Sequence, residues 1–116
     1  MLWKIALVVP VVALGSVGAA RAEFGAIAFG NGKSSKVFGQ PSQQKARMQA
    51  RSKCGQHCRA IVFGSGKCAA FAVSGNGVQF PGTGTSLNDA ENAAMGACNA
   101  KASLRGNCRI GVSACQ

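Results

Sequence analysis

The chain has 116 residues, with 13 Lys and Arg against 3 Asp and Glu, six cysteines and a single histidine. This length forms one small domain at most, and domains of this size are often stabilised by disulfides or metal ions. One histidine and three acidic residues are too few for catalytic sites that combine several such groups. The composition therefore indicates a protein that is not an enzyme, and we expect no cofactor.

Residues 1–22 have the pattern of a signal peptide. A positive charge precedes an uncharged run from Ile5 to Gly18, and alanines at 20 and 22 fit a cleavage site before Glu23. The run is shorter than the roughly 18 apolar residues that span a bilayer. We therefore expect a mature chain of residues 23–116 without a transmembrane segment, located in the periplasm or secreted.

The mature chain consists of two similar halves, repeat one at about 24–68 and repeat two at about 69–115. Each contains Gly-Asn-Gly, then a serine followed by alanines four residues apart that end at a cysteine, and then a Cys-Arg pair. The two serines lie 44 residues apart and the two Cys-Arg pairs 50 residues apart. The same features in the same order indicate an internal repeat within a single domain.

Each half begins with two predicted strands. The first strands are expected at 24–29 and 69–74, and each leads into a Gly-Asn-Gly turn that favours a hairpin. The second strands are expected to be short, at 37–39 and 78–80. Pro41 and Pro81 follow them and cannot donate a ladder hydrogen bond, so the pairing is expected to stop there.

A helix and a final strand complete each half. The helices are predicted to begin at Ser42 and Ser86. Asp89 lies three residues after Ser86 and forms a variant of the capping box with it. The final strands, at 59–63 and 109–113, are apolar and β-branched and are expected to lie centrally. The predicted fold class is α+β, a small disulfide-stabilised domain of two strand-strand-helix-strand repeats with helices packed on antiparallel sheet.

Several of these segments together resemble a known family. They are FGAIA at 24–28, the alanine-rich helix ending at Cys54, CRAIV at 58–62, CAAFAV at 68–73 and the repeated helix ending at Cys98. The combination resembles the bacterial exported family catalogued as domain of unknown function 4189, over nearly all of the mature chain. The resemblance implies an exported, cysteine-paired domain, and it implies no catalytic residue because no activity is established for that family.

The six cysteines are expected to form three disulfides, because an exported chain folds in an oxidising compartment. Repeat symmetry reduces the 15 possible connectivities to one in which a cysteine ending each helix pairs with the cysteine opening the next strand. The remaining pair is then expected to tie the two repeats together. The predicted disulfides are Cys54 to Cys58, Cys98 to Cys108, and Cys68 to Cys115.

Two other interpretations of this region are weaker. Cys54, His57, Cys58 and Cys68 have ligand types that suit zinc, but repeat two has no counterpart of His57. His57 beside Cys58 could act as a base next to a nucleophile. Adjacent residues on a strand point to opposite faces, however, so a surface histidine is the better prediction. No metal site is therefore expected.

The sequence Gly-Ser-Gly-Lys at 64–67 is similar to the end of a phosphate-binding loop. That motif requires glycine at the position of Ile61 and Ser or Thr at the position of Cys68. Neither requirement is met, so these residues are predicted to form a tight turn, in which Gly64 and Gly66 supply a permissive backbone.

Positive charge is concentrated in the first half. Residues 23–67 contain 8 basic and 1 acidic side chains, whereas 68–116 contain 3 basic and 2 acidic. Four of the cations are expected on the solvent side of the first helix, opposite Ala46 and Ala50. This face either keeps the protein soluble or binds anions. Its residues, the predicted binding site, are Lys45, Arg47, Arg51 and Lys53.

We expect an exported binding or interaction domain whose partner is an anionic envelope polymer, lipid head groups or an acidic protein. Nucleic acid is not expected, because no aromatic platform interleaves the basic residues. The alternative is a small inhibitor or modulator of a secreted or periplasmic enzyme, acting through loops such as 99–107 or 81–85. The salt dependence of binding distinguishes the anion-binding domain from the inhibitor, because salt screens the attraction between exposed charges more than it weakens a packed interface.

Overall fold

The computed structural model describes residues 22–101, 103 and 106–116, so residues 1–21 of the predicted signal peptide lie outside the described part. No helix in the described part is long and apolar enough to cross a membrane. The elements follow one another in the predicted order of strand, strand, helix, strand, twice over. They are β1 (Phe24–Gly30), β2 (Lys33–Gln40), α2 (Gln43–Cys54), β3 (Arg59–Gly64), β4 (Cys68–Val73), β5 (Gln79–Gly84), α3 (Leu87–Asn99) and β6 (Arg109–Cys115).

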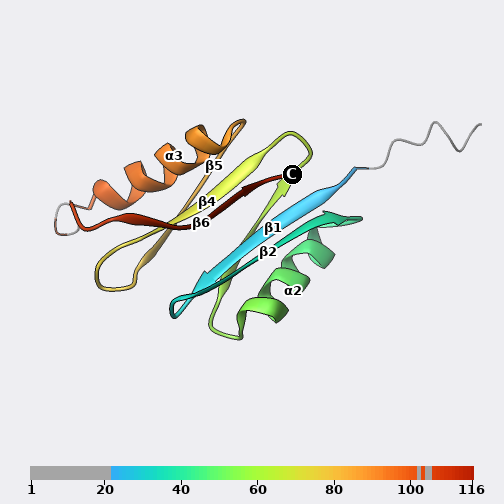
Figure 1. Ribbon diagram of the computed structural model, residues 1–116, viewed down its shortest axis with the longest axis horizontal. Helices are drawn as coiled ribbons and strands as arrows, with labels where there is room; N and C mark the ends of the chain where they lie inside the picture. Colours follow the sequence, from blue (N-terminus) through green and yellow to red (C-terminus); the bar gives the residue numbers. More distant parts are fainter. Residues whose placement is uncertain (1–21, 102, 104–105) are drawn as a thin grey trace, which may run out of the picture.

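Each repeat forms its own antiparallel sheet of three strands, in the order β2-β1-β3 in the first and β5-β4-β6 in the second. The two sheets face each other, and each is covered on its outer side by the helix of its own repeat (Figure 1). The molecule therefore has four layers, helix, sheet, sheet and helix. The α+β class and the packing of helices on antiparallel sheet are confirmed.

The central strands β1 and β4 are buried on both faces. Their larger side chains point between the sheets, where Ile27 and Phe71 are fully buried in the common core. Their other face carries alanines, which meet the buried alanines and cysteine of the covering helix. Small side chains on both surfaces let helix and sheet approach closely. The helical residues that form these contacts are Ala46, Ala50 and Cys54 in α2, and Ala90, Ala94 and Cys98 in α3.

The expectation that the final strands lie centrally is wrong, because β3 and β6 are edge strands. The first strand of each repeat is the one whose two faces are both covered, by a helix and by the other sheet. The hairpin places the second strand on one side of it. The chain then forms the helix, and the third strand pairs with the free edge of the first strand.

The second strands are longer than expected. Residues Asn31 and Gly32 both have positive φ, 50° and 76°, which makes a two-residue turn after which β2 pairs at once with β1. Strand β5 continues through Pro81 as far as Gly84. Proline is tolerated there because β5 is an edge strand and the missing N–H is not needed for pairing with β4.

Both helices begin where the sequence predicts. The hydroxyl of Ser42 accepts a hydrogen bond from the Lys45 N–H at 3.1 Å, and the hydroxyl of Ser86 accepts one from the Asp89 N–H at 3.0 Å. The acid at Asp89 also lies in the first turn, near the positive end of the helix dipole. The N-terminal caps were therefore readable from short sequence spacings alone.

Replacing Gly96 by alanine should stabilise the protein by about 1 kcal/mol, because glycine is that much less favourable than alanine inside a helix. Gly96 lies within α3 and is exposed, and an added Cβ would meet no atom within 4 Å. Urea denaturation of the variant and the wild type measures the difference. A destabilised variant would contradict this prediction and would mean that another part of the chain packs closely against α3 at position 96.

Candidate functional site

All six cysteines are joined in disulfides, in the three pairs that repeat symmetry predicts. The Cys54–Cys58 disulfide closes the turn after α2, and the Cys98–Cys108 disulfide closes the loop after α3. No free thiolate is therefore left for the zinc set around His57 or for a nucleophile at Cys58. The histidine itself is exposed in the turn between α2 and β3.

One expectation about the disulfides is wrong. The bond from Cys68 to Cys115 does not tie the repeats together, because Cys68 is the first residue of β4 and pairs directly with Cys115 of β6. Both cysteines belong to the second sheet. The counterpart position in the first sheet is the unlinked pair of Phe24 and Gly64. The two sheets are held together by the apolar side chains between them and not by a disulfide.

The four cations of α2 are all exposed. A helix turns about 100° per residue, so the arginines lie on one flank of the buried stripe and the lysines on the other. Met48, which is 59% exposed, lies between the two flanks at the outermost part of the helix. The sequence placed these cations directly opposite the alanines, whereas the helix distributes them along both flanks of the buried stripe. We call this surface the cationic face of α2, formed by Lys45, Arg47, Arg51 and Lys53.

None of the four charged groups has an ion-pair or hydrogen-bond partner among the described residues. The three acids of the chain, by contrast, are engaged elsewhere. Glu91 accepts a hydrogen bond from the Ser113 hydroxyl at 2.7 Å, Asp89 one from Thr85 at 3.4 Å, and Glu23 one from Gln116 at 3.3 Å. A partner of the cationic face would therefore not have to displace an internal carboxylate.

The two outer layers have opposite charge. Helix α2 carries the four cations and no acid, whereas α3 carries Asp89 and Glu91 and no cation. The helices lie on opposite sides of the molecule, with both sheets between them (Figure 1). Stacked sheets alone are about 10 Å apart, more than the screening length of about 8 Å at physiological ionic strength. The acids of α3 therefore hardly weaken the positive potential at α2.

A shallow depression of about 370 Å³ lies at the end of the cationic face. It is lined by three residues of the helix, Met48, Arg51 and Ser52, and by the two residues that follow the helix, Gly55 and Gln56. The lining combines a thioether and the aliphatic stem of an arginine with one guanidinium. An anionic group bound at Arg51 would therefore find an apolar contact beside it.

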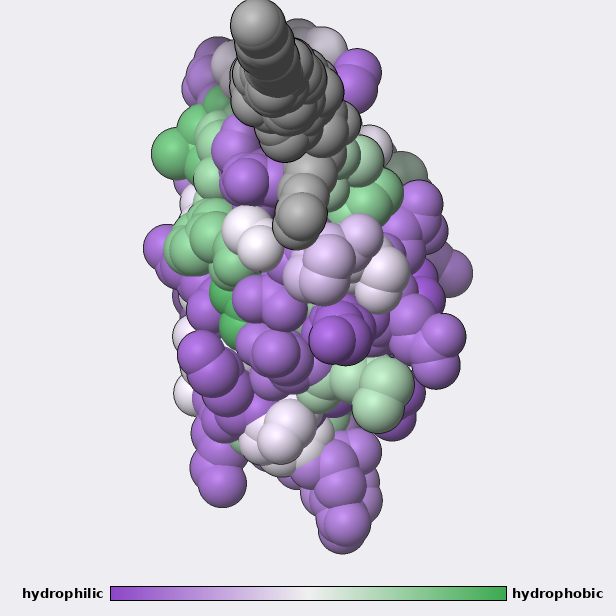
Figure 2. Space-filling model, turned by 90° about the vertical axis from the view of Figure 1, so that its right-hand side faces the viewer, coloured by the Kyte–Doolittle hydropathy of each residue, from purple (hydrophilic) through white to green (hydrophobic). Residues whose placement is uncertain are grey.

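The rest of the surface offers little apolar area for docking. Figure 2 shows the end of the sandwich at which β1 begins, and hydrophilic residues cover most of it, with small separate hydrophobic areas. Over the described residues the exposed large hydrophobic side chains are also scattered, on β2, α2, the loop before β5 and the start of α3. They are Phe38, Met48, Val78 and Leu87. Scattered apolar side chains of this kind are usual on a protein surface.

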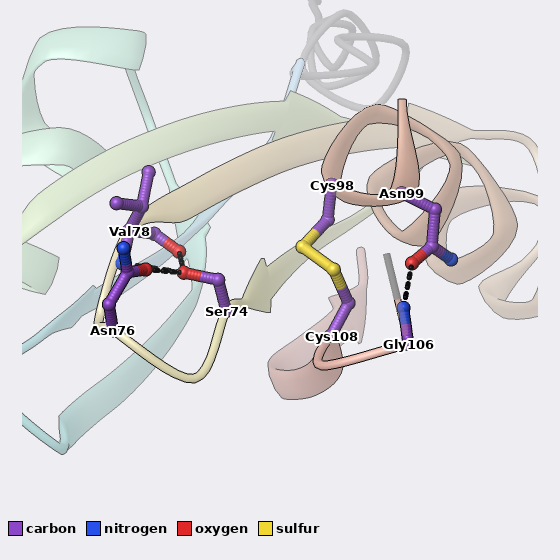
Figure 3. Close-up of a disulfide and its surroundings, with 7 residues drawn as sticks. All are labelled: Ser74, Asn76, Val78, Cys98, Asn99, Gly106 and Cys108. Carbon is purple, nitrogen blue, oxygen red and sulfur yellow. Dashed lines mark hydrogen bonds between the residues drawn. A yellow bond between two sulfur atoms is a disulfide. The ribbon is translucent and has the colours of Figure 1, made fainter. Parts of the chain in front are cut away.

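The two loops proposed for an inhibitor have different outcomes. Residues 81–84 are not a loop but the end of β5. In the loop 99–107, the Gly106 N–H donates to the Asn99 side chain at 3.4 Å and the Cys98–Cys108 disulfide closes the base (Figure 3). Residues 102, 104 and 105 of that loop lie outside the described part.

The turn at 64–67 is tight, as predicted, with the Lys67 N–H bonded to the Gly64 carbonyl at 3.1 Å.

The sequence did not single out a second group of residues, at the end of the sandwich where both first strands finish. The structure brings both Gly-Asn-Gly turns to this end, together with Gln79 and the arginines of the two Cys-Arg pairs, Arg59 and Arg109. The signal that could have found them was the repetition itself, because both the turn and the Cys-Arg pair occur in each half.

Comparison with known proteins identifies a family that this chain matches. The model of a family described as Domain of unknown function (DUF4189) matches residues 24–115, which is nearly the whole described part of the chain. Searches of the curated proteins and of the solved structures give no match.

Proposed function

Because the chain belongs to the DUF4189 family, whose description names no activity, we propose its function from the geometry of this chain. The protein is an exported, non-enzymatic binding domain, periplasmic or secreted, that contacts anionic envelope components or an acidic protein through the cationic face of α2. The signal peptide pattern supports export. The three disulfides agree with an oxidising compartment.

The observation that supports this proposal is the separation of charge between the two outer helices. Four exposed cations without internal partners lie on one side of the molecule, and two acids lie on the helix of the opposite side. Such an arrangement turns one defined face of the protein toward an anionic surface. A solubilising charge distribution would not need this polarity.

The chemistry of the face favours a partner with several anionic groups. Arg47 and Arg51 are one helical turn apart and can each form a bidentate pair with a carboxylate or phosphate. Lys45 and Lys53 lie on the other flank and act as point charges. Anionic envelope polymers, lipid head groups and acidic proteins all present such groups in series. Exposed pairs are individually weak, so binding depends on all four cations together.

Replacing all four cations of the face by glutamine should weaken binding to anionic vesicles at least about a hundredfold at low salt. Each basic residue near an anionic surface contributes roughly 1 kcal/mol. The fold should be nearly unchanged, because glutamine suits a helix about as well as lysine or arginine. Co-sedimentation with vesicles of phosphatidylcholine with and without phosphatidylglycerol, and with an acidic polysaccharide, measures the loss.

A matched control removes the same net charge elsewhere, by glutamine at four exposed lysines outside α2, namely Lys33, Lys36, Lys67 and Lys101. This control should retain most of the binding. Equal loss in both variants would mean that net charge and not the face of α2 is responsible, and unchanged binding in the α2 variant would leave solubility as the role of these residues. Binding that persists at high salt would favour the inhibitor alternative, since a packed interface is screened less.

A further inference from the structure

Three of the four edge strands of the two sheets are interrupted. Strand β2 contains one residue more than β1 beside Gly39, and it carries the exposed lysines Lys33 and Lys36. Strand β5 has Pro81 at a position whose N–H would point outward, and β6 has an extra residue at Gly111 opposite β4. Bulges, prolines and lysines of this kind prevent an edge strand from pairing with another chain.

The fourth edge strand, β3, has none of these features. Its six residues pair with β1 one for one, without a shift of register. Its sequence RAIVFG contains no proline or lysine, and the isoleucine, valine and phenylalanine are favourable in strands. Among the described residues, β3 pairs with no strand other than β1. A regular strand with one free side is a template for an additional strand.

The hydrogen bonds of the first hairpin determine which backbone groups of β3 are free. The turn at Asn31 and Gly32 has two residues, so the residues that flank it, Gly30 and Lys33, exchange both of their hydrogen bonds. Going back along β1 from Gly30, every second residue therefore bonds to β2. The residues between these bond to β3 on the other side, and Ile27 is one of them.

Ala60 and Val62 direct their backbone N–H and C=O groups away from the sheet. The partner of Ile27 in β3 is Ile61, whose backbone groups are turned toward β1, so those of its two neighbours are turned to the other side. No hydrogen bond within the described residues uses these four groups. Both residues are only half-buried, so an extended segment can reach their backbone groups.

The edge of β3 runs beside the edge of β5 on the same side of the sandwich. At the start of the two strands, Arg59 donates from Nη1 to the backbone carbonyl of Gln79 at 3.1 Å. Near the ends of the two strands, residues of both line a cavity of about 310 Å³. A segment paired with β3 therefore passes this cavity.

The lining of the cavity indicates the chemistry of such a segment. Val62 and Phe63 of β3 and Thr83 of β5 form its walls, and the exposed Lys67 adds a positive charge. An apolar side chain fits between the walls, and a carboxylate next to it can pair with the ammonium group of Lys67. The cavity therefore suits a segment that combines apolar and acidic residues.

We propose that the free edge of β3 binds an extended acidic segment of a partner protein, which adds a fourth strand to the sheet of repeat one. The backbone of the segment exchanges hydrogen bonds with Ala60 and Val62, and an acidic side chain pairs with Lys67. Backbone hydrogen bonds supply the affinity in this mode of binding, and the side chains at the cavity supply the specificity. The site is separate from the cationic face of α2, because that helix covers the face of the sheet and not its edge.

A second copy of this chain suits the edge less well. Two chains paired through β3 would place both α2 helices on the same face of one continuous sheet. Residues 23–67 of each chain contain 8 basic and 1 acidic side chains, so the two halves would repel each other. The other three edges of a second copy are interrupted. Charge therefore favours an acidic partner over self-association.

Titration of ¹⁵N-labelled protein with an extended acidic peptide tests the proposal by NMR. The probe has seven residues, alternating valine and threonine with glutamate at each end, and its termini are acetylated and amidated. It should shift the amide signals of Ala60 and Val62 in a saturable manner and slow their hydrogen exchange. The amide of Ile61 already bonds to β1 and should change little in exchange.

Two N-methylated forms of the peptide distinguish strand pairing from attraction between charges. One is methylated at the backbone nitrogens of its threonines and the other at those of its valines. Alternate residues of a strand face the same side, so only one of the two forms loses donors to β3. That form should bind at least about tenfold more weakly, and the other should bind nearly as the unmodified peptide does.

Three variants of the protein locate the site. Ala60→Pro removes an outward N–H and should reduce affinity at least about tenfold, while its Tm stays close to that of the wild type, since proline is tolerated at an outward edge position. Lys67→Gln should reduce affinity about threefold, because exposed ion pairs are weak. Lys101→Gln is its control, since it removes the same charge at the end of α3, and it should bind the peptide as the wild type does.

Three results would overturn the proposal. They are the absence of saturable shifts at Ala60 and Val62, equal affinities of the two N-methylated peptides, and sedimentation of the free protein as a dimer in which these two amides are already protected. The peptide comparison decides even if Ala60→Pro fails to fold. The four-glutamine variant of α2 should keep the same ratio of affinities for the two methylated peptides, whatever its result with vesicles.

Discussion

Replacing Cys68 and Cys115 together by alanine should lower the free energy of unfolding by about 4 kcal/mol, the largest effect expected from any disulfide of this protein. The two cysteines are separated by 47 positions, so the bond closes a loop that contains nearly all of repeat two. In the loop-entropy model, the restriction that a disulfide places on the unfolded chain grows with the length of that loop. Urea denaturation without reductant measures the difference.

The pair Cys54 and Cys58 provides the matched control, because it is separated by only 4 positions and its removal should cost about half as much. Both variants lose one disulfide. Cys54 and Cys58 are both buried, whereas Cys68 is buried and Cys115 exposed, so a larger loss for Cys68 and Cys115 reports the length of the loop and not the burial of the cysteines. If the short-range pair proved the more important, the role of these disulfides would lie in holding the folded turn after α2 and not in restricting the unfolded chain.

Gly82→Ala should destabilise the protein by about 3 kcal/mol. Gly82 lies in β5 directly beneath α3, and an added Cβ would come within 2.3 Å of the Ala94 nitrogen and 2.7 Å of the Ala90 carbonyl oxygen. These are backbone atoms of the helix, so no side-chain rotation can relieve the overlap. The helix would have to move away from the sheet and lose the close packing of its alanines.

Gly96→Ala is the control for this prediction, because the same atom is added to α3 on its open side. Alanine at 82 and alanine at 96 should therefore change the free energy of unfolding in opposite directions. Amide hydrogen exchange adds a second measurement, since protection in α3 should fall in Gly82→Ala even if the rest of the fold persists. A stable Gly82→Ala variant with normal protection would mean that the helix lies farther from β5 than the structure shows.

Much of the candidate surface was open to prediction from local sequence. The N-caps at Ser42 and Ser86, the small-residue stripes of both helices and the exposure of the α2 cations all depend on spacings of three or four residues along one helix. What the sequence could not predict is that these cations face away from the acids of α3. That separation exists only because the two repeats stack with their sheets inside and their helices outside.

The sequence by itself determined the repeat, the order of the elements and the partners of the six cysteines, because each depends on chemistry within one chain segment or on matching two segments. The tertiary structure decided which strands are central, how far β5 continues past Pro81, and that the Cys68 disulfide lies within one sheet. It also brought Gln79 and Arg109 to one cavity, although 30 positions separate them. These features depend on which faces are buried when two sheets pack together, and burial is a property of the whole molecule, which no local spacing records.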